Sequence, residues 1–396
     1  MPKQDFYHSS IGIKQIIAIF VIIINNTEGE EEYMQLNEEN VRQALSAVID
    51  PDFGQDIITL NMVKNIIIEG NKVKFELELT TPACPLKEKF RQDCTEAIAG
   101  IGVGNVEVDI DMTADVTSIR DEAPLLPGVR NIIAVASGKG GVGKSTVSSN
   151  LAVSLAKTGA KVGLVDADIF GPSIPTMFNC EKEQPSVKQV DGKNLIIPVE
   201  QYGVKLLSIG FLSPQESAIV WRGPMASSAL KQFLSDTEWG ELDYLLIDLP
   251  PGTSDIHLTL VQSVSVTGAV VVSTPQKVAL ADAIKGISMF QQDQINVPVL
   301  GLVENMAYFT PEELPDNKYY IFGKDGVKNL AAKNKVPFLG EVPLIQGIRE
   351  SGDNGYPAAL KEGPMAEAFL EIAENFARQV AIRNANLDPT KIVNVS

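Results

Sequence analysis

The chain contains little cysteine and histidine for its 396 residues. Its three cysteines, Cys84, Cys94 and Cys180, are too few and too scattered to form a disulfide framework, which favours a reducing cytoplasmic location. The two histidines, His8 and His257, exclude a metal centre built from several imidazoles.

Positive charge is scarce as well, because 33 Lys and Arg residues stand against 50 Asp and Glu residues, a net charge of −17. Non-specific binding of nucleic acid needs clustered Lys and Arg, so the general surface is unsuited to that role and we expect no nucleic-acid partner. The length predicts two or three domains with ample core.

Long apolar runs are missing too, since the stretch Ile16–Ile24 is much shorter than the ~20 residues that span a bilayer. We therefore expect no stable membrane association. Residues 1–33 differ from the rest of the chain, and we favour a start site assigned too far upstream, with Met34 as the working initiator. A signal-peptide core and a disordered or interfacial extension are the alternatives, although no small-residue cleavage site follows the apolar run.

The most informative stretch is Ser137–Thr146, which reads Ser-Gly-Lys-Gly-Gly-Val-Gly-Lys-Ser-Thr. It follows the apolar run Ile132–Ala136 and precedes a helical pattern, and it fits the G-x-x-x-x-G-K-[ST] pattern of a phosphate-binding loop. Glycines let backbone N–H groups curl around phosphate oxygens. The residues predicted to bind nucleotide are Gly138, Lys139, Gly140, Gly141, Val142, Gly143, Lys144, Ser145 and Thr146.

ATP and Mg²⁺ are the cofactors that this loop predicts. Lys144 can reach the terminal phosphates and is a candidate catalytic residue, while Ser145 is a candidate Mg²⁺ ligand. The lysine of this pattern serves catalysis by neutralising charge on the transferred phosphoryl group.

Carboxylates follow two further buried strands at the end where ligands bind in parallel sheets. The strand predicted over Val162–Val165 leads into Asp166 and Asp168. We expect Asp168 to orient the attacking water or to approach Mg²⁺ through water, and Asp166 to support it by hydrogen bonding. The strand over Tyr244–Ile247 leads into Asp248, which is placed to hold Mg²⁺ through water.

A switch is predicted at Asp248–Asp255, because Gly252 would let a backbone N–H approach the γ-phosphate. Strands alternate with helical patterns through the rest of this region, which predicts an α/β fold with a doubly wound, mostly parallel sheet. Asn305 and Pro343 each follow a predicted strand of this sheet, and we expect them to contact the base.

The first part of the chain predicts a small α+β domain. Asn37 can cap a helix, and alternating residues such as Val73, Phe75 and Leu77 predict half-buried strands. Cys84 is expected at the N-terminus of a following helix, where the helix dipole would lower the pKa of its thiol. It is then a candidate nucleophile or metal ligand, or alternatively a small buried residue of a tight turn.

Five segments are predicted from these patterns. They are an extension over 1–33, a small domain over 35–112, a linker over 113–130, a nucleotide-binding domain over 131–385 and a tail over 386–396. The linker contains Pro127-Gly128 and shows little periodicity, so we expect it to let the two domains move relative to one another.

Lys139 distinguishes this loop from the general pattern. It cannot reach the phosphates bound in its own loop as easily as Lys144 can. With the Asp-x-Asp and Asp-x-Pro-Pro-Gly segments, it makes the domain resemble the deviant Walker-A ATPases. That resemblance implies a nucleotide-sandwich homodimer in which Lys139 crosses the interface and takes part in catalysis.

Within that family the chain resembles the Mrp/ApbC-type iron–sulfur cluster carriers. Its stretches Asp50–Asp52, Leu60–Val63 and Leu79–Leu86 together resemble a small iron–sulfur assembly domain. The marks of the carriers are Ala134–Gly141, Asp166–Ser173, Trp221–Pro224, Asp248–Thr253 and Gly301–Met306. The resemblance implies slow ATP hydrolysis and the transfer of bound iron–sulfur clusters to apoproteins. Homodimers, apoprotein clients and iron–sulfur assembly proteins are the implied partners.

One family feature is missing, because the usual C-x-x-C pair after Asn-Met-x-Tyr-Phe is replaced by Thr310–Glu313. Glu312 and Glu313 are hard ligands that suit iron–sulfur clusters poorly. Either Cys84 handles the cluster, with a ligand from a partner, or the protein is an ATPase that assists maturation. A spatial-positioning ATPase of Min or Par type is the alternative function, but it would need a basic amphipathic C-terminal helix or a basic face for DNA.

Overall fold

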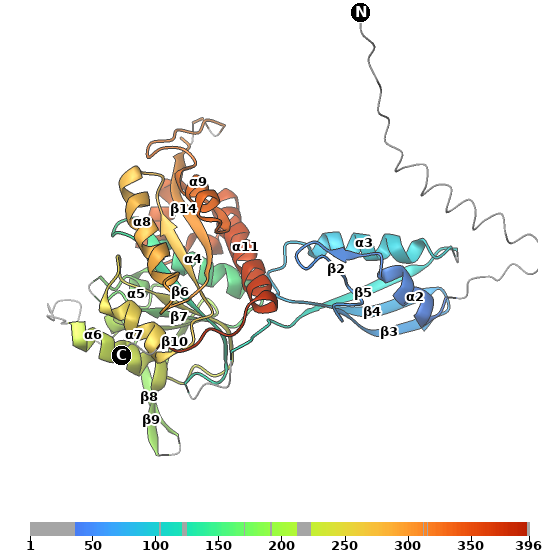
Figure 1. The fold of residues 1–396 in the computed structure, drawn as a ribbon, viewed down its shortest axis with the longest axis horizontal. Coiled ribbons are helices and arrows are strands. Elements are labelled where there is room, and N and C mark those ends of the chain that lie inside the picture. Colours follow the sequence, from blue (N-terminus) through green and yellow to red (C-terminus); the bar gives the residue numbers. More distant parts are fainter. Residues whose placement is uncertain are drawn as a thin grey trace, which may run out of the picture.

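The computed structural model describes residues 36–102, 104–120, 125–169, 171–190, 192–211, 223–311, 313–314 and 316–393. The predictions for residues 1–33, for Met34 as the initiator and for Glu312 lie outside these residues. Two lobes are visible in Figure 1. The small domain runs from α2 (Glu38–Leu45) to β5 (Glu107–Ala114), and the large domain from β6 (Val129–Ser137) to α11 (Pro364–Asn386).

The small domain has a three-stranded sheet in the order β3-β4-β5. Its strand β3 (Val63–Glu69) pairs antiparallel with β4 (Lys72–Leu79), and β4 pairs parallel with β5 after a crossover through α3 (Lys87–Ala99). A two-stranded ribbon of β1 (Ile49–Asp50) and β2 (Gln55–Asp56) completes it. As predicted, the Asn37 side chain caps α2 by accepting a hydrogen bond from the Asn40 N–H at 2.9 Å.

The prediction for Cys84 is wrong in its position. Helix α3 begins at Lys87 with Leu86 as its N-cap residue, so Cys84 lies in the turn before the helix rather than at its N-terminus. The physical reason is Pro85, because a residue that precedes proline is driven out of the helical region of backbone space. The dipole of α3 therefore does not act on the thiol in the way that the sequence suggested.

The large domain is built on an eight-stranded sheet in the order β10-β11-β7-β12-β6-β13-β14-β15. All neighbouring strands are parallel except β10 and β11, which confirms the predicted doubly wound, mostly parallel sheet. Besides β6, the strands are β7 (Val162–Asp166), β10 (Val199–Gln201), β11 (Val204–Ser208), β12 (Leu242–Asp248), β13 (Gly268–Ser273), β14 (Val299–Phe309) and β15 (Phe338–Leu344).

Helices cover both faces of this sheet (Figure 1). Neighbouring residues of β6 point to opposite faces, so Ile133 packs with α4 and α11 while Ile132 packs with α6 and α7. The helices are α4 (Lys144–Lys157), α5 (Ile174–Met177), α6 (Gly223–Ser235), α7 (Asp255–Ser263), α8 (Lys277–Phe290), α9 (Gly326–Asn334), α10 (Gln346–Asp353) and α11, with the 3₁₀ turns η1 (Ile209–Phe211) and η2 (Ala358–Leu360).

A hairpin of β8 (Ser186–Val190) and β9 (Lys193–Ile197) projects from the large domain at the bottom of Figure 1. The sequence analysis did not predict this hairpin or the strand β11. Both lie between the two Asp-bearing strands, where short apolar runs carry no strong periodicity.

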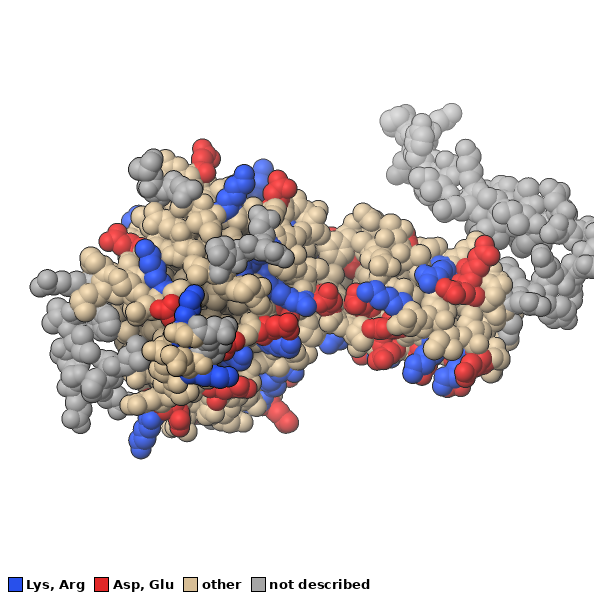
Figure 2. All heavy atoms as spheres, turned by 90° about the horizontal axis from the view of Figure 1, so that it is seen from below, with Lys and Arg blue, Asp and Glu red and all other residues tan. Residues whose placement is uncertain are grey.

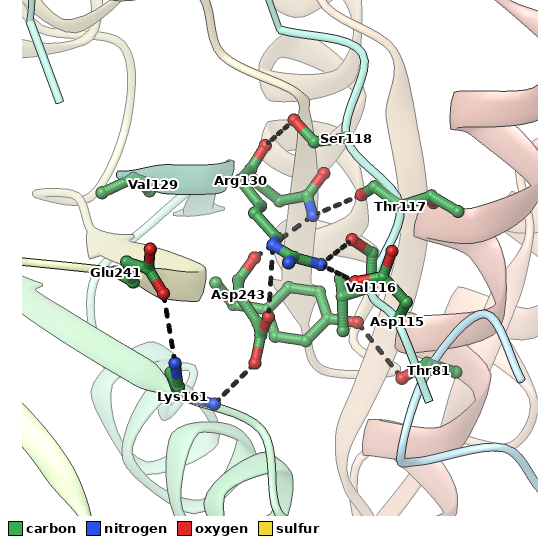
Figure 3. Close-up of polar contacts among 12 residues, drawn as sticks. Thr81, Asp115, Val116, Thr117, Ser118, Val129, Arg130, Lys161, Glu241 and Asp243 are labelled. Atoms are coloured by element: carbon green, nitrogen blue, oxygen red, sulfur yellow. Dashed lines mark hydrogen bonds and ion pairs between the residues drawn. The ribbon is translucent and has the colours of Figure 1, made fainter. Parts of the chain in front are cut away.

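The linker makes polar contacts with the large domain, and the expectation that it lets the two domains move relative to one another stays a prediction. Its side chains and carbonyls meet the first residues of β6, as Figure 3 shows. Arg130 pairs with Asp115, and the Asn131 amide donates to the Thr117 carbonyl at 3.0 Å. Arg120 is held by backbone carbonyls of the segment that leads into β6. The described linker residues therefore anchor the small domain.

Helix α11 packs on the sheet along its whole apolar side. The side chains of Phe369, Ile372, Phe376 and Val380 are buried in the large-domain core. This is the packing predicted for the final helix, and it leaves no free apolar face of the kind that a membrane-binding helix uses. None of the helices among the described residues is long and apolar enough to cross a membrane. On the face drawn in Figure 2, basic side chains are interspersed with acidic ones.

Replacing Phe376 by Ala tests this packing. Phe376 is 0% exposed, so Phe376→Ala is expected to lower the free energy of unfolding by about 3–5 kcal/mol through lost burial and a residual cavity. Leu370→Ala is the control on the same helix, because that side chain is 38% exposed. Urea unfolding followed by circular dichroism measures both, and equal midpoints for the two variants would contradict the packing described for α11.

Candidate functional site

The candidate site lies at the carboxyl edge of the large sheet, where the loop Ser137–Thr146 joins β6 to α4. Strand β12 lies beside β6, and β7 lies beside β12. Their carboxyl ends therefore bring Asp248 of β12 and Asp166 of β7 to the same edge as the glycine loop. The structure brings together the loop and the carboxylates that the sequence analysis selected.

Glycine is sterically required at two positions of the loop. Gly143 has φ of 81°, and a Cβ there would lie 2.1 Å from Nδ2 of Asn305. A Cβ on Gly138 would lie 2.2 Å from the carbonyl carbon of Asp282 in α8. The loop is thus confined between β14 and α8, with its backbone turned toward the open edge of the sheet.

Asn305 has a structural role that the sequence analysis missed. Its buried side-chain amide donates to the Val142 carbonyl at 2.8 Å and so holds the glycine loop in place. The predicted contact between Asn305 and the base remains a prediction.

Lys144 and Ser145 meet the Asp248 carboxylate in the buried centre of the site. The Lys144 ammonium lies 2.8 Å from Asp248 Oδ2, and the Ser145 hydroxyl donates to the same oxygen at 2.6 Å. The Ser148 hydroxyl donates to Asp248 Oδ1 at 2.6 Å. Ser148 was not predicted, although its spacing of four residues from Lys144 places it on the same side of α4.

Asp166 organises the turn that carries Asp168. One of its carboxylate oxygens accepts the Asp168 N–H, and the other accepts the Ser208 hydroxyl at 3.0 Å. The backbone N–H groups of Ser173 and Ile174 also donate to Asp166. Asp168 itself lies 3.7 Å from the Lys144 ammonium, at the open side of the site. The supporting role predicted for Asp166 corresponds to these hydrogen bonds.

Negative charge exceeds positive charge inside the site. Asp166 and Asp248 are 0% exposed, and with Asp168 they lie near the buried Lys144 ammonium, the one buried lysine side chain among the described residues of the site. Burial, followed by the charge of Asp248, raises the pKa of Asp166. Carboxylate and hydroxyl oxygens are the ligands that Mg²⁺ prefers, so Ser145 and Asp248 fit the predicted ion and the charge that it brings.

The predicted switch is in contact with the glycine loop. Gly252 has φ of 82°, and its N–H donates to the Ser137 carbonyl at 2.8 Å. Helix α7 begins after it with a capping box between Ser254 and His257. Burial lowers the pKa of His257 to about 4, so this imidazole is neutral at physiological pH. The predicted contact of the Gly252 N–H with a γ-phosphate remains a prediction.

Two adjoining cavities form a groove along the glycine loop. One cavity of about 210 Å³ is lined by the loop together with Asp168 and Pro251. The next, of about 410 Å³, shares Gly143 and Thr146 with it and is also lined by Pro343. The first cavity has the polar lining that phosphates need, and the second has apolar walls suited to a base. The contact of Pro343 with the base stays a prediction, and Met177 of α5 and Ile348 of α10, which also line the second cavity, were not predicted.

The cysteines are separate from this site. Burial raises the pKa of the Cys84 thiol, with smaller contributions from the charges of Asp50 and Asp52, so the predicted lowering of its pKa is wrong. Cys94 and Cys180 are buried in the cores of the small and large domains. Among the residues that the structure describes, no three His, Cys, Asp or Glu side chains are grouped so as to hold a metal ion.

A glycine loop between a central parallel strand and a helix, with a carboxylate at the end of the next strand, defines a P-loop NTPase. The comparisons with known proteins specify the family. The chain belongs to the NUBPL iron-transfer P-loop NTPases, whose family model matches residues 128–377. A second family model, described as an iron-sulfur cluster assembly protein, matches residues 38–114. These matches confirm the resemblance drawn from the sequence.

Similar proteins span nearly the whole chain. An iron-sulfur cluster carrier protein of Synechocystis sp. is 45% identical over 350 residues, covering 88% of this chain and 99% of that protein. The iron-sulfur cluster carrier protein of Escherichia coli is 41% identical over 334 residues, covering 83% and 89% of the two chains. A nucleotide-binding protein of Archaeoglobus fulgidus, solved in complex with ADP, has a TM-score of 0.52 and 42% identity, covering 60% of this chain and 91% of that one.

Removal of the Lys144 ammonium tests the nucleotide site. Lys144→Ala is expected to weaken ATP binding by about 2–5 kcal/mol, roughly 30- to 5000-fold, because a buried cation that faces the phosphates is lost. Lys161→Ala is the control, since that lysine is exposed and pairs with Glu241 at the other end of the strands. Titration with a fluorescent ATP analogue measures both variants, and equal affinities would contradict the assignment of the site.

Proposed function

We propose that this protein binds and hydrolyses ATP, carries iron–sulfur clusters and transfers them to apoproteins, and works as a nucleotide-dependent homodimer. The observation that carries the proposal is the constellation of Lys144, Ser145 and Asp248 in a chain 45% identical to an iron-sulfur cluster carrier protein. Apoprotein clients and iron–sulfur assembly proteins are the proposed partners, and free cysteines support a reducing, cytoplasmic location.

Hydrolysis would use groups that already converge on the open edge of the sheet. Lys144 and the N–H groups of the loop would bind the phosphates, and Ser145 with Asp248 would hold Mg²⁺. The ion, when bound, neutralises charge on the phosphate oxygens. Asp168 would orient the attacking water, since it lies at the open side of the site near Lys144. When ATP binds, the Lys144 ammonium would give up part of its contact with the carboxylates and contact phosphate oxygens instead.

Lys139 supports the homodimer. It lines the loop cavity, yet within the described part of the chain no hydrogen bond or ion pair engages its ammonium. Two exposed apolar side chains lie at the same edge. Leu258 is in the first turn of α7, which follows β12, and Val278 is in the first turn of α8, which follows β13. A second copy facing this edge would cover these side chains and bring Lys139 to the partner's phosphates.

The cargo is expected to involve Cys84. Iron–sulfur clusters need soft thiolate ligands, and Cys84 is the one cysteine of the three that is not buried. A single thiolate leaves other iron positions open, so a partner protein or a second copy would supply the remaining ligands. Thr310 and Glu313, which stand near the place of the usual cysteine pair, offer only oxygen atoms.

Lys139→Ala tests the homodimer. We expect this variant to keep most of its affinity for ATP while its turnover falls about 100-fold or more, because a cation supplied across an interface acts mainly in the transition state. Measurement of ATP affinity and of phosphate release at several protein concentrations separates the two effects. Hydrolysis at the wild-type rate by Lys139→Ala would show that the role across the interface is wrong.

Anaerobic reconstitution with iron and sulfide tests the cargo. Wild-type protein is expected to bind a cluster and pass it to an apoprotein, while Cys84→Ala loses most of the bound iron and Cys180→Ala, at a buried site, retains it. Iron and sulfide content, the absorbance spectrum and activation of the apoprotein are the measurements. Failure of wild type and Cys84→Ala alike to bind or transfer a cluster would reject the carrier function.

A further inference from the structure

Two polar contacts join the small domain to the large domain beside α11. Asp52, in the turn between β1 and β2, accepts from the Arg378 guanidinium, with the Nε atom 2.5 Å from Oδ1. The Thr81 hydroxyl lies 3.2 Å from the Tyr244 hydroxyl, a contact visible in Figure 3. Ala83, which lies near Thr81 in the sequence, is buried in the core that also contains side chains of α4 and α11.

The ion pair of this interface is partly exposed, whereas Thr81 and Tyr244 are buried. Arg378 is 39% exposed and Asp52 is 11% exposed, so the ion pair is partly hydrated and contributes little to stability by itself. Polar contacts of limited extent between domains of one chain permit relative motion. The linker, in contrast, stays tied to β6 through Asp115 and Thr117, so the small domain would pivot about its attachment rather than separate.

Cys84 lies at the edge of this interface. It directly follows the buried Ala83, its side chain packs against the core of the small domain, and it contributes to the raised pKa of Arg378 in the large domain. The carboxylates of Asp50 and Asp52 face it from the small domain, and burial is the largest cause of its raised pKa. The thiol is half-buried, and this burial disfavours its reactive thiolate form.

We propose that the Asp52–Arg378 and Thr81–Tyr244 contacts form a latch that docks the small domain on the large domain, and that opening of this latch makes Cys84 accessible. The inference rests on the proposed function only for the role of Cys84 as a cargo ligand. The latch itself concerns the accessibility of a thiol and can be tested without a cluster.

The elements of the latch also carry the nucleotide site. Tyr244 lies on β12, which ends in Asp248, and its ring centroid is 5.6 Å from that of Phe376 on α11. Helix α11, which carries Arg378, packs against α4, whose first residue is Lys144. The nucleotide state of the site can therefore act on the latch through β12 and α11, and the proposal includes this coupling.

The three cysteines provide the assay, because Cys94 reports on the fold of the small domain, Cys180 on that of the large domain and Cys84 on docking. Full-length protein is treated with N-ethylmaleimide, and labelling at each cysteine is followed by mass spectrometry. Tyr244→Phe and Arg378→Asp are expected to label Cys84 roughly threefold to tenfold faster than wild type, as loss of one such contact allows. Arg42→Ala, which breaks an exposed ion pair within α2, is the matched control and leaves the rate unchanged.

A charge exchange separates docking from a local effect at Arg378. The double variant Asp52→Arg, Arg378→Asp restores the ion pair with reversed signs and is expected to return the rate toward that of wild type. A variant in which N-ethylmaleimide labels Cys94 or Cys180 is misfolded. In that case Tyr244→Phe, which removes only one oxygen atom, decides whether the latch exists. Equal rates at Cys84 in wild type and Tyr244→Phe would overturn the latch.

Nucleotide provides the last arm of the experiment. ATP with Mg²⁺ is expected to change the rate at Cys84 at least threefold in wild type and to leave it unchanged in Lys144→Ala. An unchanged rate in wild type would overturn the coupling between the latch and the nucleotide site. If cluster reconstitution fails while the latch variants behave as expected, the cargo role is wrong and the latch stands, whereas normal cluster transfer with equal labelling rates rejects the latch alone.

Discussion

The structure of the large domain depends on one electrostatic constraint, the burial of one ammonium group among three carboxylates. Lys144, Asp248 and Asp166 are each no more than 5% exposed, so their charges must be balanced by one another and by nearby donors. The hydroxyls of Ser145, Ser148 and Ser208 and the amides near Asp168 supply those donors. In the function that we propose, Ser145 and Asp248 would hold a divalent cation here, and such an ion, when bound, would neutralise charge on the phosphate oxygens.

This constraint explains which parts of the site could be predicted from the sequence. The glycine loop and the carboxylates that follow apolar strands are local patterns, and parallel strands bring their carboxyl ends to one edge whatever the loops between them do. Ser208 could not be found in this way, because its contact with Asp166 requires β11 to lie beside β7. The contact of Asn305 with Val142 could not be predicted either, since it joins positions 163 residues apart.

The small domain shows where local reasoning gives the wrong sign. A cysteine before a helix is expected to have a lowered thiol pKa, but Pro85 delays the helix and tertiary burial dominates, so the pKa of Cys84 is raised. The contacts of the linker were missed for a related reason. Its composition is typical of a flexible connector. Its backbone and side chains are nevertheless bound by Arg130, its last residue, and by Asn131, which directly follows it. Composition alone cannot reveal such partners.

The same contacts relate the two halves of the proposed function. A carrier that couples ATP to a cluster needs a physical link between the phosphate site and the thiol, and the two lie on different domains. In the arrangement that we propose, helix α11 is that link, because it packs on α4 and also carries Arg378, which pairs with Asp52 at a separation of 326 residues in sequence. With oxygen-bearing residues in place of the usual cysteine pair, the chain has no thiol at the nucleotide edge after Cys180. An effect of bound nucleotide on a thiol ligand of this chain would therefore have to pass from that edge through the large domain to the interface where Cys84 lies.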